Sequence, residues 1–138
     1  ALIHFQYITN KRGKQMKTTM VFETAKTLEK GIENMMFGAK KDYYDWTTNN
    51  GQKDLTGYSK EQMDNWDKMI KITNGKKYIK IVRDRGVFAF VMKEDSGKFK
   101  KGDILKPSSF RAPALNSARG NVLTGQYPIR WTGPLYLK

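Results

Sequence analysis

Residue types on which many enzymes and metal proteins depend are scarce in this sequence. The chain of 138 residues has no cysteine and a single histidine. Without cysteine it has no disulfide framework, no cysteine-ligated zinc or iron–sulfur centre and no thiol nucleophile. We therefore expect a protein of a reducing, intracellular compartment, whose fold depends on a buried core and needs no covalent staple.

Candidate catalytic groups are equally few. The one histidine, His4, lies in an apolar stretch, where a hydrogen-bonded core side chain is a commoner role than general base or ligand. Only carboxylates remain as metal ligands, and helical spacing places Asp64 and Asp67 beside Lys68 and Lys71 on a solvated face. We expect no enzymatic activity, no cofactor and no metal site. A nuclease that holds metal through carboxylates is the weakest alternative.

Long apolar runs are missing as well. No stretch approaches the roughly 18 consecutive apolar residues of a membrane span. The apolar part of the first residues precedes their charges, which is the reverse of the order in a secretory signal. These features predict a cytoplasmic protein without membrane contact. The length suits a single domain over residues 1–138.

Acidic residues are the other scarce class, and their placement is informative. Lysine and arginine number 26 against 13 acids, which leaves a formal net charge of +13. Segments 1–21, 76–97 and 98–138 carry +4, +3 and +7, whereas segment 22–75 carries −1. An excess that spares the middle of the chain is typical of a surface for a polyanionic partner. A general contribution to solubility is the alternative.

Apolar periodicity predicts two helices in the first half of the chain. Apolar residues at steps of three and four indicate a helix from an N-cap at Thr19 to about Lys40. A capping box at residues 59–62, followed by an apolar face that ends at Gly75, indicates a second helix over about residues 60–73. Turn-forming residues between the two helices predict a loop at 43–58.

After Gly75 the apolar period changes to two, which predicts strands to the end of the chain. A turn at Arg83–Gly86 separates two of them, and the second is apolar on both faces, as in a central strand. Residues 106–118 are expected to be irregular. The expected fold is α+β, with two helices packed against a twisted, mostly antiparallel β-sheet. The expected strands are residues 2–8, 76–82, 87–92, 98–105, 121–123 and 128–132.

Bases and aromatic residues alternate along the basic half of the chain, which suits a single-stranded nucleic acid. Unpaired bases stack on aromatic rings or guanidinium planes, while lysine and arginine neutralise the backbone. Readers of duplex concentrate basic residues on a recognition helix, and neither expected helix is basic. Phe88, Phe90 and Trp131 are expected mainly in the core. The candidate nucleic-acid-binding residues are Arg83, Arg85, Lys98, Lys100, Lys101, Lys106, Phe110, Arg111, Arg119, Tyr127 and Arg130.

The last part of the chain resembles a known family. The run KFKKGDILKPSSFRAPALNSARGNVLTG, followed by IRWTGPLYL, is similar to the Drc-type single-stranded DNA-binding proteins of bacteriophages that encode their own RNA polymerase. The likeness covers residues 98–138 and leaves out the helical first half. It implies sequence-tolerant binding of single-stranded DNA, self-association into a homo-oligomer and a role in phage transcription or replication in the infected cell. RNA polymerase is a second expected partner. The positions that carry over are Lys100, Lys101, Arg111, Arg119, Arg130 and Trp131.

The function expected from the sequence is sequence-tolerant binding of nucleic acid, with single-stranded DNA first and RNA second. The main alternative is a protein-interaction module, such as a phage factor that binds a host or phage polymerase through exposed aromatic residues of segment 43–58.

Overall fold

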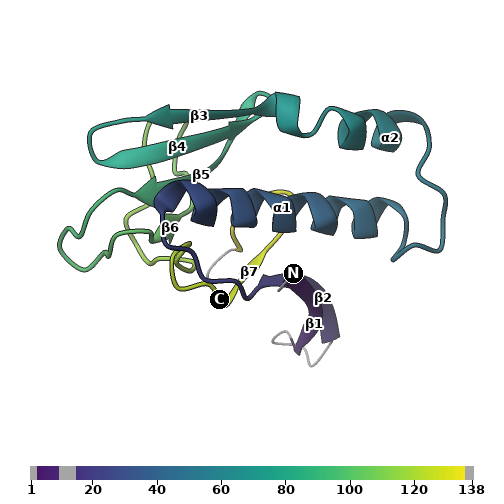
Figure 1. Cartoon of the computed structure of the whole chain (residues 1–138), viewed down its shortest axis with the longest axis horizontal. Coiled ribbons are helices and arrows are strands. Elements are labelled where there is room, and N and C mark those ends of the chain that lie inside the picture. The colour runs from purple at the N-terminus through teal and green to yellow at the C-terminus, as the bar shows by residue number, and fades with distance from the viewer. Residues whose placement is uncertain (1–2, 10–14, 136–138) are drawn as a thin grey trace.

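Two antiparallel sheets and one long helix form the framework of the chain (Figure 1), which the computed structural model describes over residues 3–9 and 15–135. One sheet has the strand order β1-β2-β7 and the other the order β3-β4-β5-β6. The fold is α+β, as the sequence predicts, although the strands form two sheets and not one. The helices are α1 (Leu28–Thr47) and α2 (Gly57–Asp64), and the strands are β1 (Ile3–Thr9), β2 (Gln15–Val21), β3 (Ile70–Asn74), β4 (Tyr78–Arg83), β5 (Gly86–Met92), β6 (Ile104–Leu105) and β7 (Tyr127–Ile129).

The helix expected from Thr19 was wrong at both ends. Residues 15–21 form β2, which pairs with β1 on one side and β7 on the other, and its β-branched threonines and valine suit a strand. The helix begins later because Thr27 is the N-cap, whose hydroxyl accepts the backbone N–H of Lys30 at 3.1 Å. It also continues past Lys40 into the expected loop, because Tyr43 extends its buried face.

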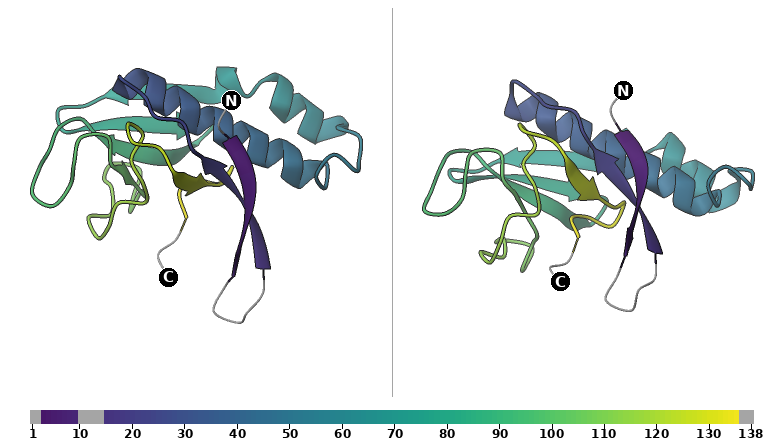
Figure 2. Two further views of the ribbon diagram at one scale, coloured as in Figure 1. Left: turned by 60° about the horizontal axis from the view of Figure 1, so that its bottom comes forward. Right: turned by 90° about the horizontal axis from the view of Figure 1, so that it is seen from below.

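The hairpin of β1 and β2 projects away from the rest of the chain (Figure 2). The strand expected at residues 2–8 is confirmed as β1, whereas its partner β2 was not expected. The turn expected at residues 10–13, with its basic side chains, lies outside the described residues, as does the expected core position of the His4 side chain.

The second helix was also predicted too long. Only α2 and a short 3₁₀ turn at Asp67–Met69 are helical, and Ile70–Asn74 form β3. The expected capping box is not made, because Ser59 lies inside α2 and the N-cap position has no side-chain hydrogen bond. Gly75, expected to end a helix, instead lies in the turn between β3 and β4, where its N–H donates to the carbonyl of Tyr78 at 2.9 Å.

The central hairpin of β4 and β5 is confirmed, with its turn at the expected place. β5 is covered on both faces, as expected of a central strand (Figure 2): Ala89 and Val91 pack in the core that α1 shares, and Phe90 and Met92 pack in a smaller core on the opposite face.

The later strands are shorter than predicted. β6 covers only residues 104–105 of the expected strand 98–105, and β7 covers 127–129 where 128–132 was expected. Segment 121–123 forms no strand and contributes a single bridge from Asn121 to Asp103. Residues 106–118 are irregular, as predicted, with only an isolated bridge between Pro107 and Pro113.

Close packing of α1 against the C-terminal part of the chain requires a glycine. A Cβ atom built on Gly31 would lie 2.5 Å from the carbonyl oxygen of Val122. Real Cβ atoms do not approach backbone oxygen so closely, so any larger residue must push the helix and this segment apart.

We expect Gly31→Ala to lower the free energy of unfolding by about 1–3 kcal/mol. The clash with Val122 should outweigh the gain of about 1 kcal/mol that alanine brings to a helix interior. The control is Gly86→Ala, because a Cβ there meets nothing within 4 Å. Urea unfolding of both variants measures the difference. Equal stability of Gly31→Ala and the parent chain would show that α1 and this segment are not in tight contact.

Candidate nucleic-acid interface

Three parts of the chain carry the predicted binding residues: the turn between β4 and β5, the segment from 93 to 120 on the face of the second sheet away from α1 (Figure 2), and the end of β7. The fold brings some of these residues together and leaves others apart or buried. They are Arg83 and Arg85 at the turn; Lys98, Lys100, Lys101, Lys106, Phe110, Arg111 and Arg119 in the long segment; and Tyr127 and Arg130 at β7.

Phe110 is presented at the tip of a tight turn. The backbone N–H groups of Ser108 and Ser109 both donate to the carbonyl of Ala112, and the Ser109 hydroxyl accepts from the N–H groups of Arg111 and Ala112 at 3.2 Å. The Phe110 ring is 57 % exposed. It lines a shallow hollow of about 240 Å³ together with Val87 and residues 107–109.

A cation lies against the Phe110 ring. The Nζ atom of Lys80, from β4, lies 3.6 Å from the ring centroid, a cation–π contact. Lys80 is therefore part of this site, although sequence analysis did not select it. Its signal was its place in β4, where it points to the face opposite its buried neighbours Ile79 and Ile81.

Arg83 lies on a group of aromatic rings. Its Cζ atom lies 4.1 Å from the ring centroid of Trp66 and 5.7 Å from that of Tyr43. One terminal nitrogen donates to the side-chain oxygen of Gln62 at 3.3 Å. Burial lowers the pKa of Arg83 from its ordinary value, although nearby Tyr43, Asp84 and Tyr58 act to raise it. Arginine stays charged under such conditions, so the site holds a partly desolvated cation.

The rings around Arg83 come from distant parts of the chain. Tyr43 contacts Trp66 and Trp131 with centroid distances of 5.8 and 5.2 Å, and Trp46 lies 5.2 Å from Trp131. Trp46 is 67 % exposed, and Trp131 is half-buried. Tyr43 and Trp46 lie in the segment that was expected to be a loop. The signal that it missed was the continuation of the α1 spacing from Ala39 to Tyr43 and Trp46.

A carboxylate fixes Trp131 in this group. Asp42, on α1, accepts the backbone N–H of Trp131 at 2.9 Å and the hydroxyl of Thr19 at 2.9 Å. Trp131 also lies in a tight turn that is closed by two hydrogen bonds between Arg130 and Gly133. The backbone at Trp131 is therefore held by Asp42 and its own turn, and the indole packs against Tyr43 and Trp46 of α1.

Two hollows that share the lining residue Val87 lie beside Phe110 and Trp131. The second hollow, of about 260 Å³, is lined by residues that include Arg83, Val87 and Trp131, and Val87 also lines the first. We call the two hollows together the stacking track. Exposed arginines flank it, because Arg85 precedes Gly86 of the second hollow and Arg111 follows Phe110 of the first.

Lys106 and Arg119, both in segment 93–120, are half-buried. Burial lowers the pKa of both residues, and the charge of Arg119 lowers that of Lys106 further, so the two cations lie near each other. Lys106 donates to the carbonyl of Pro134 at 2.9 Å, and Arg119 donates to the carbonyl of Ser117 at 3.1 Å. Lys106 and Arg119 therefore contribute mainly positive electrostatic potential, because neither presents a fully exposed hydrogen-bond donor.

The remaining predicted lysines lie apart from the track. Lys98, Lys100 and Lys101 are exposed and line neither hollow. Lys98 Nζ bonds to the carbonyl of Asn116, and carboxylates of Asp95 and Asp103 fix the backbone of Lys101 and Lys100 at 2.8 Å. Arg130 is half-buried next to Trp131.

Tyr127 is in the core, which rules out the stacking role expected of it in the folded chain. It packs against Gly120, where a Cβ atom would lie 2.4 Å from the Tyr127 Cβ. Its hydroxyl is buried without a hydrogen-bond partner among the described residues, and burial raises its pKa above the ordinary value. Phe88 and Phe90 are buried, as expected.

The acidic residues and the helices complete the description of the predicted groups. No group of three His, Asp or Glu side chains within residues 3–9 and 15–135 is arranged to hold a metal ion. Asp64 pairs with Lys60 at 2.7 Å and not with the expected lysines. In the same part of the chain, neither helix has the length and apolar character needed to cross a bilayer.

We expect Tyr127→Phe to raise the free energy of unfolding at pH 7 by about 1 kcal/mol, because it removes a buried hydroxyl that has no acceptor. The folded-state pKa is raised, so the unfolded chain ionises first and the parent loses stability as pH rises above the ordinary value of about 10. The advantage of Tyr127→Phe should therefore grow above that pH. Urea unfolding at pH 7 and at a pH above about 10 measures the difference in stability between Tyr127→Phe and the parent chain, with exposed Tyr58→Phe as control. A destabilised Tyr127→Phe at pH 7 would show that the hydroxyl has a partner.

Comparison with known proteins adds a family to this description. No curated protein and no solved structure matches the sequence. A family model described as a family of unknown function, DUF7717, matches residues 4–135, which is nearly the whole chain. The protein therefore belongs to the DUF7717 family.

Proposed function

We propose that the protein binds single-stranded nucleic acid, DNA in preference to RNA, on the stacking track and without strong sequence preference. The observation that carries the proposal is the pair of hollows that share Val87, with Phe110 at one of them and Trp131 with Arg83 at the other. Each hollow offers a planar group to an unpaired base, and such stacking tolerates any base because every base has a π face.

No carboxylate of the described residues competes with phosphate for the arginines of the candidate interface. Arg83, Arg85, Arg111, Arg119 and Arg130 form no salt bridge with a described residue. A polyanion therefore gains their attraction without having to displace a protein carboxylate. The net charge of +13 adds attraction from a distance.

The arrangement favours single strands over duplex. A duplex keeps its bases stacked on each other, so the rings of the track offer it little beyond contact with its backbone. Neither helix carries a row of basic residues that fits a major groove: α1 has both charges along its length, and α2 has one lysine. Binding of duplex should then depend mainly on charge.

The biological setting of this proposal comes from the resemblance of residues 98–138 to Drc-type phage proteins. On that basis the protein acts in the cytoplasm of an infected cell, in phage transcription or replication, as a homo-oligomer. RNA polymerase is a further proposed partner. The track itself lies partly outside the region of resemblance, since Arg83 and Val87 precede residue 98.

A second function, docking of a protein partner, is favoured by the exposed aromatic residues of segment 43–58. Trp46 and Tyr58 have most of their surface exposed, and large aromatic residues are common at the centre of protein interfaces. Tyr58 lies near Arg83, so this surface adjoins the track. Failure of every oligonucleotide to bind at low salt would favour this second function.

Phe110→Ala should weaken binding of a fluorescein-labelled single-stranded oligonucleotide by about 1–3 kcal/mol. The matched control is Phe37→Ala, because Phe37 is 56 % exposed against 57 % for Phe110 and lies outside the track. Duplex should lose less affinity than the single strand in Phe110→Ala. Fluorescence anisotropy at one fixed salt concentration measures the affinity of the parent chain and of both variants for the single strand and for the duplex. Equal effects of the two phenylalanine changes would contradict stacking at Phe110.

The double variant Arg85→Ala/Arg111→Ala should flatten the dependence of log affinity on log salt. Each phosphate contact with a single strand contributes a slope of about 0.7, so the loss of both arginines should reduce the slope by about 1.4. Lys26→Ala/Lys53→Ala removes the same charge from exposed positions outside the track and serves as control. If the control flattens the slope as much, general charge and not the track holds the nucleic acid.

A further inference from the structure

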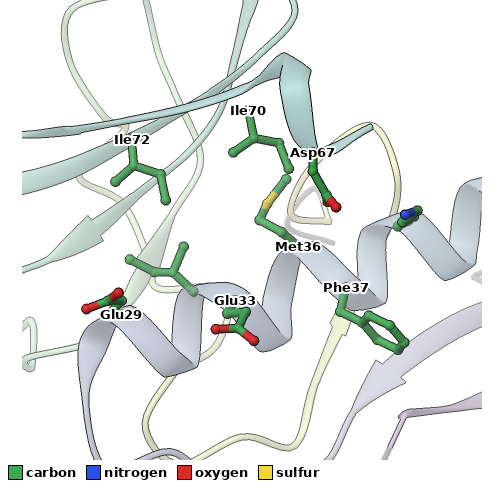
Figure 3. A pocket seen from close by; sticks show the side chains of 9 residues that line it. Glu29, Glu33, Met36, Phe37, Asp67, Ile70 and Ile72 are labelled. Atoms are coloured by element: carbon green, nitrogen blue, oxygen red, sulfur yellow. The ribbon is translucent and has the colours of Figure 1, made fainter. Parts of the chain in front are cut away.

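A groove of about 540 Å³ runs between α1 and β3 (Figure 3). Its apolar lining comes from Ile32, Met36 and Phe37 of the helix and from Ile70 and Ile72 of the strand. Half of the Ile72 surface and 56 % of the Phe37 surface are exposed. The groove shares no lining residue with the stacking track. An inference about it is therefore independent of the proposed nucleic-acid binding.

The groove lies beside an open strand edge. Within the described chain β3 pairs only with β4 and ends the sheet order β3-β4-β5-β6. At the two ends of the hairpin, the N–H groups of Gly75 and Asp84 donate to the carbonyls of Tyr78 and Met69. Backbone direction alternates along an antiparallel pair, so residues 71 and 73 face β4 and residues 70, 72 and 74 face outward.

Ile72 is the centre of this open edge. Ile70 already uses its N–H group in a bond to the carbonyl of Asp67, whereas β3 offers both the N–H and the carbonyl of Ile72 outward. The Ile72 side chain lines the groove. Proteins usually protect exposed edge strands with a charge or a proline, and here Lys71 lies on the opposite face of the strand. On the side that lines the groove the edge is therefore apolar and carries no charge, which is suited to the addition of another strand.

The groove is acidic on a basic protein. Glu29, Glu33 and Asp67 line it against the single cation Lys40. Figure 3 shows Glu29 at one end of the groove and Asp67 toward the other. Glu33 is paired with Lys30 at 3.3 Å, which leaves the two end carboxylates as the main charges. This lining repels a phosphate backbone and attracts a basic partner.

We propose that the groove binds an extended peptide segment that adds to β3 as an outer strand and whose groove-facing side chains, at every second position, are apolar in the middle and basic at both ends. The backbone of Ile72 supplies the central hydrogen bonds. Apolar side chains of the peptide pack on Ile72 and Met36, and lysine or arginine near its ends meets Glu29 and Asp67. A second copy of this chain and a nucleic acid are the other occupants that the test distinguishes.

The test uses the full chain and a fluorescein-labelled peptide of about nine residues, a usual strand length. Its groove-facing positions, at every second residue, are lysine at both ends and valine between them, and the intervening positions are threonine. Ile72→Lys should weaken its binding about tenfold or more, because it places a like charge on the edge. Thr73→Lys adds the same charge one residue along, on the opposite face, and should change affinity less than about twofold. Equal effects of the two changes would overturn the proposal. Circular dichroism checks that both variants are folded.

Two further arms separate strand addition from adsorption. The same peptide with N-methylated amides keeps its charge but cannot pair, so it should bind at least about tenfold more weakly. Glu29→Gln should weaken the parent peptide about two- to fivefold, with exposed Glu61→Gln as control. Full binding of the methylated peptide would overturn the proposal. Two other results would also overturn the proposal. One is self-association of the chain that Ile72→Lys abolishes, with no binding of the peptide. The other is oligonucleotide binding that Ile72→Lys changes and no other variant does.

Discussion

The burial of α1 against strands of both sheets is the constraint on which the rest of the structure depends. The core that surrounds it contains Val21 of β2, Ile81 of β4, Ala89 of β5 and Ile129 of β7, so elements from both ends of the chain meet on one helix. The two sheets have no strand in common. Their relation is therefore set by what each packs against, and that element is α1.

The position of α1 also sets the two surfaces of the molecule. Its C-terminal half carries Tyr43, Trp46 and Asp42, which hold Trp131 at the stacking track. Its N-terminal half carries Glu29 and Glu33 along the groove beside β3. The nearly neutral segment 22–75 thus supplies both the aromatic support of a basic surface and an acidic surface of its own. Acidic and basic residues are mixed along the sequence of this segment, and the helix places Glu29 and Glu33 together along the groove.

Local signals made the central hairpin predictable. The alternation from Tyr78 to Met92 and the turn between the strands lie within one short segment, so no distant contact can reverse them. The second helix failed because Met63, Trp66 and Ile70 also continue a helical spacing, whereas Ile70 and Ile72 alternate and find β4 as a partner. Pairing with a neighbouring strand overrides helix propensity when both patterns fit.

The candidate site was less predictable than the fold, because its geometry is made by contacts far apart in sequence. Asp42 and Trp131 are 89 residues apart, and nothing in the composition of either segment indicates that they meet. The arginines and Phe110 could be selected from their residue types alone. Which aromatic residue is exposed could not be predicted, because Tyr127 and Phe110 both lie among basic residues in the sequence. Tyr127 is buried through the pairing of β7 with β2 and its packing on Gly120, whereas Phe110 is exposed.

Arg83 shows that the core and the site share residues at a cost to stability. The indole N–H of Trp66 and the Nε of Arg83 are both buried without an acceptor among the described residues, and each such group costs about 1–3 kcal/mol. A leucine or methionine at position 83 would cover Trp66 without the unsatisfied Nε group of the arginine. The chain instead keeps a charged, planar group at the wall of a hollow beside Trp131. This cost to stability is explained if the guanidinium contacts a ligand that offers both a π face and an anion, and a single-stranded nucleic acid offers both.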